Sequence, residues 1–230
     1  MQSPRKVPVK AIALFAVALL LIAAWLALRM GAASWTAEDT EQDLSAWDKR
    51  TNETGLPPTQ AEWQAAMRDV QAAIARNPRD PHLKELESRL LALTIRVGEG
   101  VTNRLSESIA PLERAAALRP TSPYTWASLA SALYANGKVD VRFYAVLERA
   151  VEAGPFEREA LFVVIELGLA VWDTAPKSTQ LAIQTALKNA DRHEAAIIVE
   201  IAQRRGKLEQ VCILPNTSKQ SACAPEKPAA

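Results

Sequence analysis

Glycine, cysteine and histidine are scarce in this chain of 230 residues. With only 8 glycines but frequent alanine, leucine, glutamate and arginine, the composition favours helices over a β-sandwich or a glycine-rich phosphate loop. Two cysteines and two histidines are too few for a zinc finger, an iron–sulfur cluster or a disulfide-dense scaffold. The net charge of +1 lacks the basic excess of a generic nucleic-acid binder. We therefore predict an all-α protein without a metal site, cofactor or nucleic-acid partner.

One long apolar run stands near the N-terminus. Residues 11–28 contain no charge, and as a helix these eighteen residues extend about 27 Å, close to the thickness of a bilayer's hydrocarbon core. Arg5, Lys6 and Lys10 precede the run, which favours a cytoplasmic N-terminus. We predict a cytoplasmic tail at 1–10 and a transmembrane helix at 11–29. In a bacterium, the rest of the chain is then a periplasmic domain on a single-pass inner-membrane anchor.

A cleaved signal peptide is the first alternative, because Gly31, Ala32 and Ala33 are small residues suited to cleavage. An eighteen-residue run exceeds the usual apolar length of a signal peptide, and Arg29 interrupts the approach to that site. We therefore favour the uncleaved anchor. A buried helix of a cytosolic protein is the second alternative.

The segment after the anchor divides into an acidic stalk and a helical domain. Residues 30–58 are polar, acidic and end in Gly-Leu-Pro-Pro, which indicates a stalk, with a short helix between residues 37 and 50 if Trp47 packs. Thr59 and Glu62 match a capping box and predict a helix start. A second helix is expected from Asp80 to Val97, antiparallel to the first. We place the helical domain at 59–207 and a mobile tail at 208–230.

A repeat is the most informative feature of this domain. The frame Leu-Glu-Arg-Ala followed by proline occurs at residues 112–120 and again at 147–155, thirty-five residues later. This spacing is close to the tetratricopeptide (TPR) period. The residues expected to pack the repeat lie at matching offsets: Trp126, Leu129, Ala130, Leu147, Ala150 and Pro155. We predict a TPR-like stack of helical hairpins, against the alternative of a generic hairpin whose frames agree by chance. Residues 156–172 predict a further buried helix, and 178–190 with 192–205 a further pair.

The first helices of TPR-like units usually form the partner-binding face. By offset from Trp126, this face carries Tyr124, Ser131, Tyr134, Glu159 and Glu166. Tyrosine suits binding surfaces because it combines apolar area with a hydroxyl. The alternative is that both tyrosines only pack against the next hairpin. No sequence motif of a known catalytic site surrounds these residues, and we predict that the chain is not an enzyme.

Cys212 and Cys223 are the only cysteines. Outside the cytoplasm they are candidates for a disulfide, and two unpaired thiols are the alternative.

Three segments together suggest a family: residues 119–127, the 147–155 frame with Phe156 and Glu157, and residues 167–173. They resemble the VpsP-type accessory proteins, which are small single-span helical proteins of bacterial exopolysaccharide synthesis and export. The resemblance covers roughly residues 105–210 and implies no catalytic residues. It implies a scaffold that binds membrane proteins of polysaccharide polymerisation or export at the inner membrane. The alternatives are a periplasmic quality-control or cytochrome-maturation TPR protein and, as a third, an enzyme acting on polysaccharide.

Overall fold

The computed structural model describes residues 9–190 and 195–212. These residues form ten α-helices, one short 3-10 helix and one two-stranded hairpin, so the all-α prediction is confirmed apart from the hairpin. They divide into two compact units. Unit 1 contains the residues up to Leu90 together with Ile95–Thr102, and unit 2 contains Leu91–Thr94 and the residues from Asn103 onward. The predicted single domain at 59–207 therefore has to be divided.

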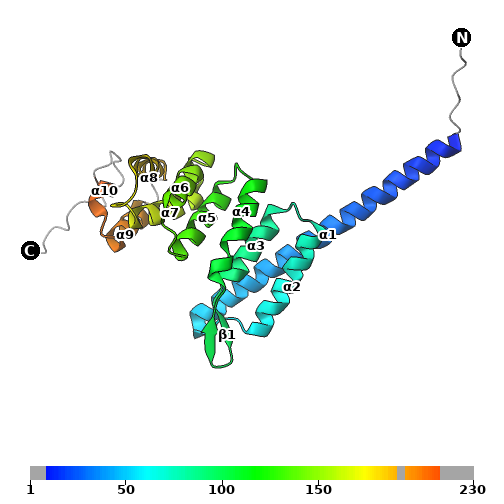
Figure 1. Ribbon diagram of the computed structural model, residues 1–230, viewed down its shortest axis with the longest axis horizontal. Coiled ribbons are helices and arrows are strands. Elements are labelled where there is room, and N and C mark those ends of the chain that lie inside the picture. The colour runs from blue at the N-terminus through cyan, green and yellow to red at the C-terminus, as the bar shows by residue number, and fades with distance from the viewer. Residues whose placement is uncertain (1–8, 191–194, 213–230) are drawn as a thin grey trace, which may run out of the picture. The chain divides into compact units, whose positions relative to one another are not determined.

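Unit 1 begins with α1, one continuous helix at Val9–Thr54 that packs against α2 at Gln60–Arg76 (Figure 1). The predicted stalk at 30–58 is wrong over most of its length, because this helix runs through it. Ala37, Thr40, Leu44 and Trp47 recur at helical spacing and are buried. The acidic residues between them occupy the other faces, which is why the segment resembles a stalk in composition alone.

The predicted transmembrane helix at 11–29 falls within α1, while residues 1–8 of the predicted tail lie outside the described residues. In the described part of the chain, no helix combines the length and the apolarity that a bilayer crossing requires. The side chains at 11–13, 26 and 28–30 lie outside those described. The described apolar side chains of this segment are exposed: Leu14, Phe15, Val17, Leu19, Leu20, Leu21, Ile22 and Trp25. The anchor stays a prediction.

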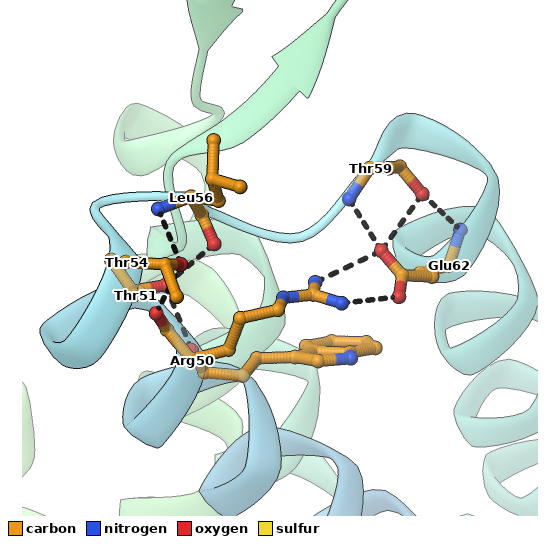
Figure 2. A network of polar contacts seen from close by, with 7 residues as sticks. Arg50, Thr51, Thr54, Leu56, Thr59 and Glu62 are labelled. Carbon is orange, nitrogen blue, oxygen red and sulfur yellow. Dashed lines mark hydrogen bonds and ion pairs between the residues drawn. The ribbon is translucent and has the colours of Figure 1, made fainter.

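A polar network joins the end of α1 to the start of α2 (Figure 2). The capping box predicted from Thr59 and Glu62 is present, with the Glu62 carboxylate accepting from the Thr59 N–H at 2.7 Å. The Arg50 guanidinium donates to both oxygens of the same carboxylate, at 2.8 and 3.0 Å. These hydrogen bonds, with Arg50 as the largest cause, lower the pKa of Glu62 to about 2. One carboxylate therefore caps α2 and ties it to α1.

We predict that Glu62→Gln reduces the dependence of the free energy of unfolding on pH in the acid range. A carboxyl group whose folded-state pKa is lowered stabilises the fold above its unfolded pKa, and this contribution disappears as the pH falls toward the folded value. Wild type should lose stability as the pH falls from about 4.5 toward about 2, the range between the two pKa values of Glu62. Glutamine keeps the capping geometry but cannot ionise, so the variant should be less stable than wild type at pH 6 and equal to it near pH 2. Urea unfolding followed by circular dichroism tests this, and parallel curves for the two proteins would contradict it.

The third helix, α3 at Pro81–Ala92, was predicted to pair with α2, but α2 packs most closely against α1. Apolar periodicity identifies the buried face of a helix and not the element that covers it. The contact of α3 with α2 includes the buried Trp63 indole N–H, which donates to the Leu90 carbonyl at 2.7 Å. On α3, His82 lies 3.5 Å from Glu41 of α1, and Arg89 lies 3.7 Å from the same carboxylate. The hydrogen bond to Glu85 raises the pKa of His82.

The helix expected to reach Val97 ends at Ala92. In its place β1 at Ile95–Val97 pairs antiparallel with β2 at Gly100–Thr102. The β-branched residues here favour strands, and Gly98 turns the chain with φ +59°. The segment expected to be the last part of a helix therefore forms a strand and a hairpin turn, with Gly98 in the turn and Gly100 at the start of β2.

Unit 2 is a stack of alternating helices (Figure 1). After a 3-10 helix at Leu105–Glu107, it contains α4 at Ile109–Leu118, α5 at Pro123–Ala135, α6 at Val141–Ala153, α7 at Arg158–Ala170, α8 at Lys177–Asn189, α9 at Ala195–Arg204 and α10 at Leu208–Cys212. In one row α5 packs against α7 and α7 against α9, while in a second row α6 packs against α8. Within the hairpins α5 packs against α6, and α7 against α8. This is the arrangement that the 35-residue repeat predicts.

One expected helix pairing and one expected boundary in unit 2 differ in the structure. The segment 178–190 was expected to pair with 192–205, but α8 packs against α7, and α9 packs against α10. The predicted mobile tail at 208–230 is wrong for residues 208–212, because α10 is helical and its Val211 is fully buried, while residues 213–230 lie outside the described residues. Its apolar residues Leu208 and Val211 span only one helical turn, and so short a segment gives too weak a periodic signal to predict a helix.

The second hairpin repeats the first with its small and large residues exchanged. In α5, Ala130 is fully buried and Leu133 nearly so. Thirty-five residues later, α7 has Ile165 and Gly168 at the corresponding positions. A Cβ added to Gly168 would lie 2.5 Å from the Ile183 side chain of α8. The smallest residue has therefore moved along the helix by about one turn, to a position where α7 and α8 leave no room for a Cβ, and this accounts for part of the sequence difference between the two units.

Candidate functional site

The second row of unit 2 contains a groove between α4 and α6, with α5 beneath it. Its volume is about 520 Å³, within the range of cavities that hold ligands. Here α4 contributes Glu113, Ala116 and Ala117. From α5 come Trp126 and Leu129, and from α6 Arg142, Ala145, Val146 and Arg149. We call these nine residues the α4–α6 groove.

The groove follows from the residue pattern of its helices. On α6, Arg142, Ala145, Val146 and Arg149 recur at spacings of three, one and three, so they form one stripe along two turns. Alanine at Ala116, Ala117 and Ala145 leaves space where larger side chains would close the gap between the helices. The next pair of helices in the same row, α6 and α8, packs directly together. Between them the Thr179 hydroxyl donates to the Glu148 carboxylate at 2.6 Å.

The lining of the groove is apolar in the middle and charged at its two ends. Arg142 forms an ion pair with Glu113 across one end, from α6 to α4. At the other end, Arg149 forms an ion pair with Glu152 of its own helix at 3.0 Å. The indole N–H of Trp126 donates to the Pro120 carbonyl at 2.9 Å, which fixes the ring within the groove. The Arg149 pair is solvent-exposed, so the arginine can exchange its partner at small cost.

The five residues predicted for a binding face lie on α5, on α7 and at its start, in the first row. Tyr124 is exposed, and its hydroxyl donates to the Glu157 carboxylate at 2.5 Å, a hydrogen bond that raises the pKa of Tyr124. Tyr134 is half-buried and its ring centre lies 6.1 Å from that of Phe143. The Ser131 hydroxyl donates to the Ala127 carbonyl of its own helix at 3.1 Å.

The two glutamates of this set differ in their surroundings. Glu159 is exposed. Glu166 is half-buried and forms an ion pair with Arg205 at 3.1 Å. Neither lines the α4–α6 groove. The first-row face therefore has several of its polar groups occupied within the chain, and it stays a predicted surface.

The predicted packing residues mostly lie in the core of unit 2. Leu129, Ala130, Leu147 and Ala150 are buried there. Trp126 is only partly buried and faces the groove, whereas Pro155 is exposed and its carbonyl accepts from Asn189 at 2.8 Å. Sequence reasoning assigned Trp126 to packing and did not identify the groove. The signal available was the stripe of small residues between two arginines on α6.

Cys212 is disulfide-bonded. Its predicted partner, Cys223, lies outside the described residues.

Comparison with known proteins identifies no family. No family model and no curated protein matches the chain. Among solved structures, one described as "Crystal structure of MamA" has 12% sequence identity and a TM-score of 0.46, covering 76% of this chain and 91% of that one. A second, "Crystal structure of MamA protein", has 12% identity and a TM-score of 0.44, covering 84% and 98% of the two chains. These scores are too low to assign the chain to a family.

Proposed function

We propose that this chain is a membrane-anchored, periplasmic, TPR-like scaffold, and that it binds proteins of exopolysaccharide polymerisation or export. The observation that carries the scaffold role is the α4–α6 groove, an apolar binding surface formed by stacked helical hairpins. Its charged groups are paired at the two ends, and its middle is formed by alanines and the Trp126 ring above the buried Leu129 and Val146. Such a lining suits the binding of apolar side chains better than acid–base chemistry.

The anchor in this proposal is supported by the apolar run at 11–28 and by the exposed apolar side chains of α1 between Leu14 and Trp25. Exposed apolar surface of this extent requires a covering partner. Because α1 is one continuous helix, the segment proposed to lie in the membrane leads directly into the packed part of unit 1. Anchoring raises the local concentration of partners in the same membrane, which compensates for the limited area of one groove.

The polysaccharide context comes from the resemblance of residues 105–210 to VpsP-type proteins. The test is deletion of the gene in its native host, complemented with the full chain or with a variant lacking residues 1–30. We expect loss of extracellular polymer on deletion and rescue by the full chain only. The full chain should remain in the membrane fraction after carbonate extraction.

The alternatives give different results in the same strains. A cytochrome-maturation role would lower c-type cytochromes and leave the polymer intact. An enzyme would change the native polymer when the purified chain is incubated with it. Recovery of the intact chain from the cytosol would contradict the anchor.

A further inference from the structure

We propose that the α4–α6 groove binds an apolar α-helical segment of a partner protein, about two to three turns long, with a carboxylate that pairs with Arg149. This inference rests on the proposed scaffold function and specifies the chemistry of the partner. It places the binding site in the second row of helices, away from the first-row residues predicted from the sequence.

The shape of the groove favours a helix. Its α6 wall extends from Arg142 to Arg149, a rise of about 10 Å, or two turns. Ala116 and Ala117 face this wall from α4. Small side chains on both walls allow the backbone of an incoming helix to approach closely, as ridges fit into grooves between packed helices. Apolar residues at positions i, i+3, i+4 and i+7 of the partner then match the two turns of the wall.

The chemistry of the lining selects against a sugar chain. Carbohydrates need several hydrogen-bonding groups. The accessible middle of this groove consists of Ala117, Ala145 and the Trp126 ring, above the buried Leu129 and Val146. The Trp126 N–H already donates to Pro120. Apolar side chains gain most from such a surface because their burial removes them from water. A peptide segment is therefore the better occupant.

The charges set the polarity of the partner. Arg142 has its counter-charge, Glu113, within the groove. Arg149 has Glu152 on its own helix, outside the lining, and both members of this pair are largely exposed. A partner carboxylate at this end would gain the arginine while Glu152 returned to water. The site should therefore prefer an acidic over a neutral residue at the end of the apolar stretch that lies beside Arg149.

The experiment selects peptides from a displayed library of helix-stabilised 15-residue sequences on the purified full-length chain. We expect enrichment of sequences with apolar residues at i, i+3 or i+4, and i+7, and with Asp or Glu at one common end of this apolar stretch. Ala145→Trp fills the groove from an exposed position and should weaken binding of an enriched peptide at least about tenfold. Ala196→Trp, at an exposed alanine of α9, is the matched control and should leave binding unchanged. Melting curves of both variants verify the fold.

Arg149→Gln tests whether Arg149 pairs with a carboxylate of the bound peptide. It should weaken an acidic peptide about fivefold and remove its preference over the matching glutamine peptide. Selected peptides that bind equally to the Ala145→Trp variant would overturn the proposal. So would binding of an acidic oligosaccharide that Ala145→Trp abolishes while no peptide is selected, or self-association of the chain through the groove. Failure of the gene-deletion test with peptide binding intact would contradict the polysaccharide role alone.

Discussion

Replacing Phe143 with alanine is expected to lower the free energy of unfolding of unit 2 by about 3–5 kcal/mol. Phe143 is fully buried and is the largest such side chain among the described residues. Its ring centre lies 6.1 Å from that of Tyr134 and 5.5 Å from that of Tyr144, so truncation removes two aromatic contacts as well as apolar burial. A loss of this size is a large part of the stability of an ordinary domain.

The matched control is Phe156→Ala. Phe156 is 77% exposed, so its truncation should change stability by no more than about 0.5 kcal/mol. Urea unfolding of the full-length chain, followed by circular dichroism, measures both variants. Equal unfolding midpoints for the two would mean that α6 does not pack its buried face as described.

The parts of the fold that the sequence predicted are those with local physical signals. The start of α2 follows from Thr59 and Glu62, and that of α3 from Asp80, because capping needs only neighbouring residues. The hairpins of unit 2 follow from the repeated frame at 112–120 and 147–155. In both cases the information lies within a few residues, or in two copies of one pattern.

The parts that the sequence did not predict depend on which surfaces meet. The burial of Leu44 and Trp47 requires α2 as a partner of α1, and no local pattern identifies that partner. The groove depends on Ala116, Ala117 and Ala145, and an alanine is compatible with both a close helix crossing and an open cavity. Ala130 is fully buried in the core and Ala145 lines a cavity, although both are alanines on the helices of one hairpin.

The second large effect is expected at Ala130, where Ala130→Trp should prevent unit 2 from folding. Ala130 is fully buried in α5, a helix that packs against α4, α6 and α7. Even a few added methylene groups in a packed core cost about 1–3 kcal/mol, and an indole ring adds far more volume than that. No surrounding helix can move aside without separating a hairpin from its neighbour.

A graded series shows whether the effect is steric. Ala130→Gly should cost about 1 kcal/mol, because glycine is a poor helix former but creates no clash. Ala130→Val should cost about 1–3 kcal/mol, and Ala130→Trp should abolish the cooperative transition of unit 2. Ala135→Trp, at an exposed position of the same helix, should keep that transition. Because Ala130 occupies the small-residue position of the predicted TPR-like unit, an unchanged melting curve for Ala130→Trp would remove the argument that this hairpin is a repeat. A loss of stability that rises from Ala130→Gly through Ala130→Val to Ala130→Trp would instead show that the neighbouring helices limit the space at this residue.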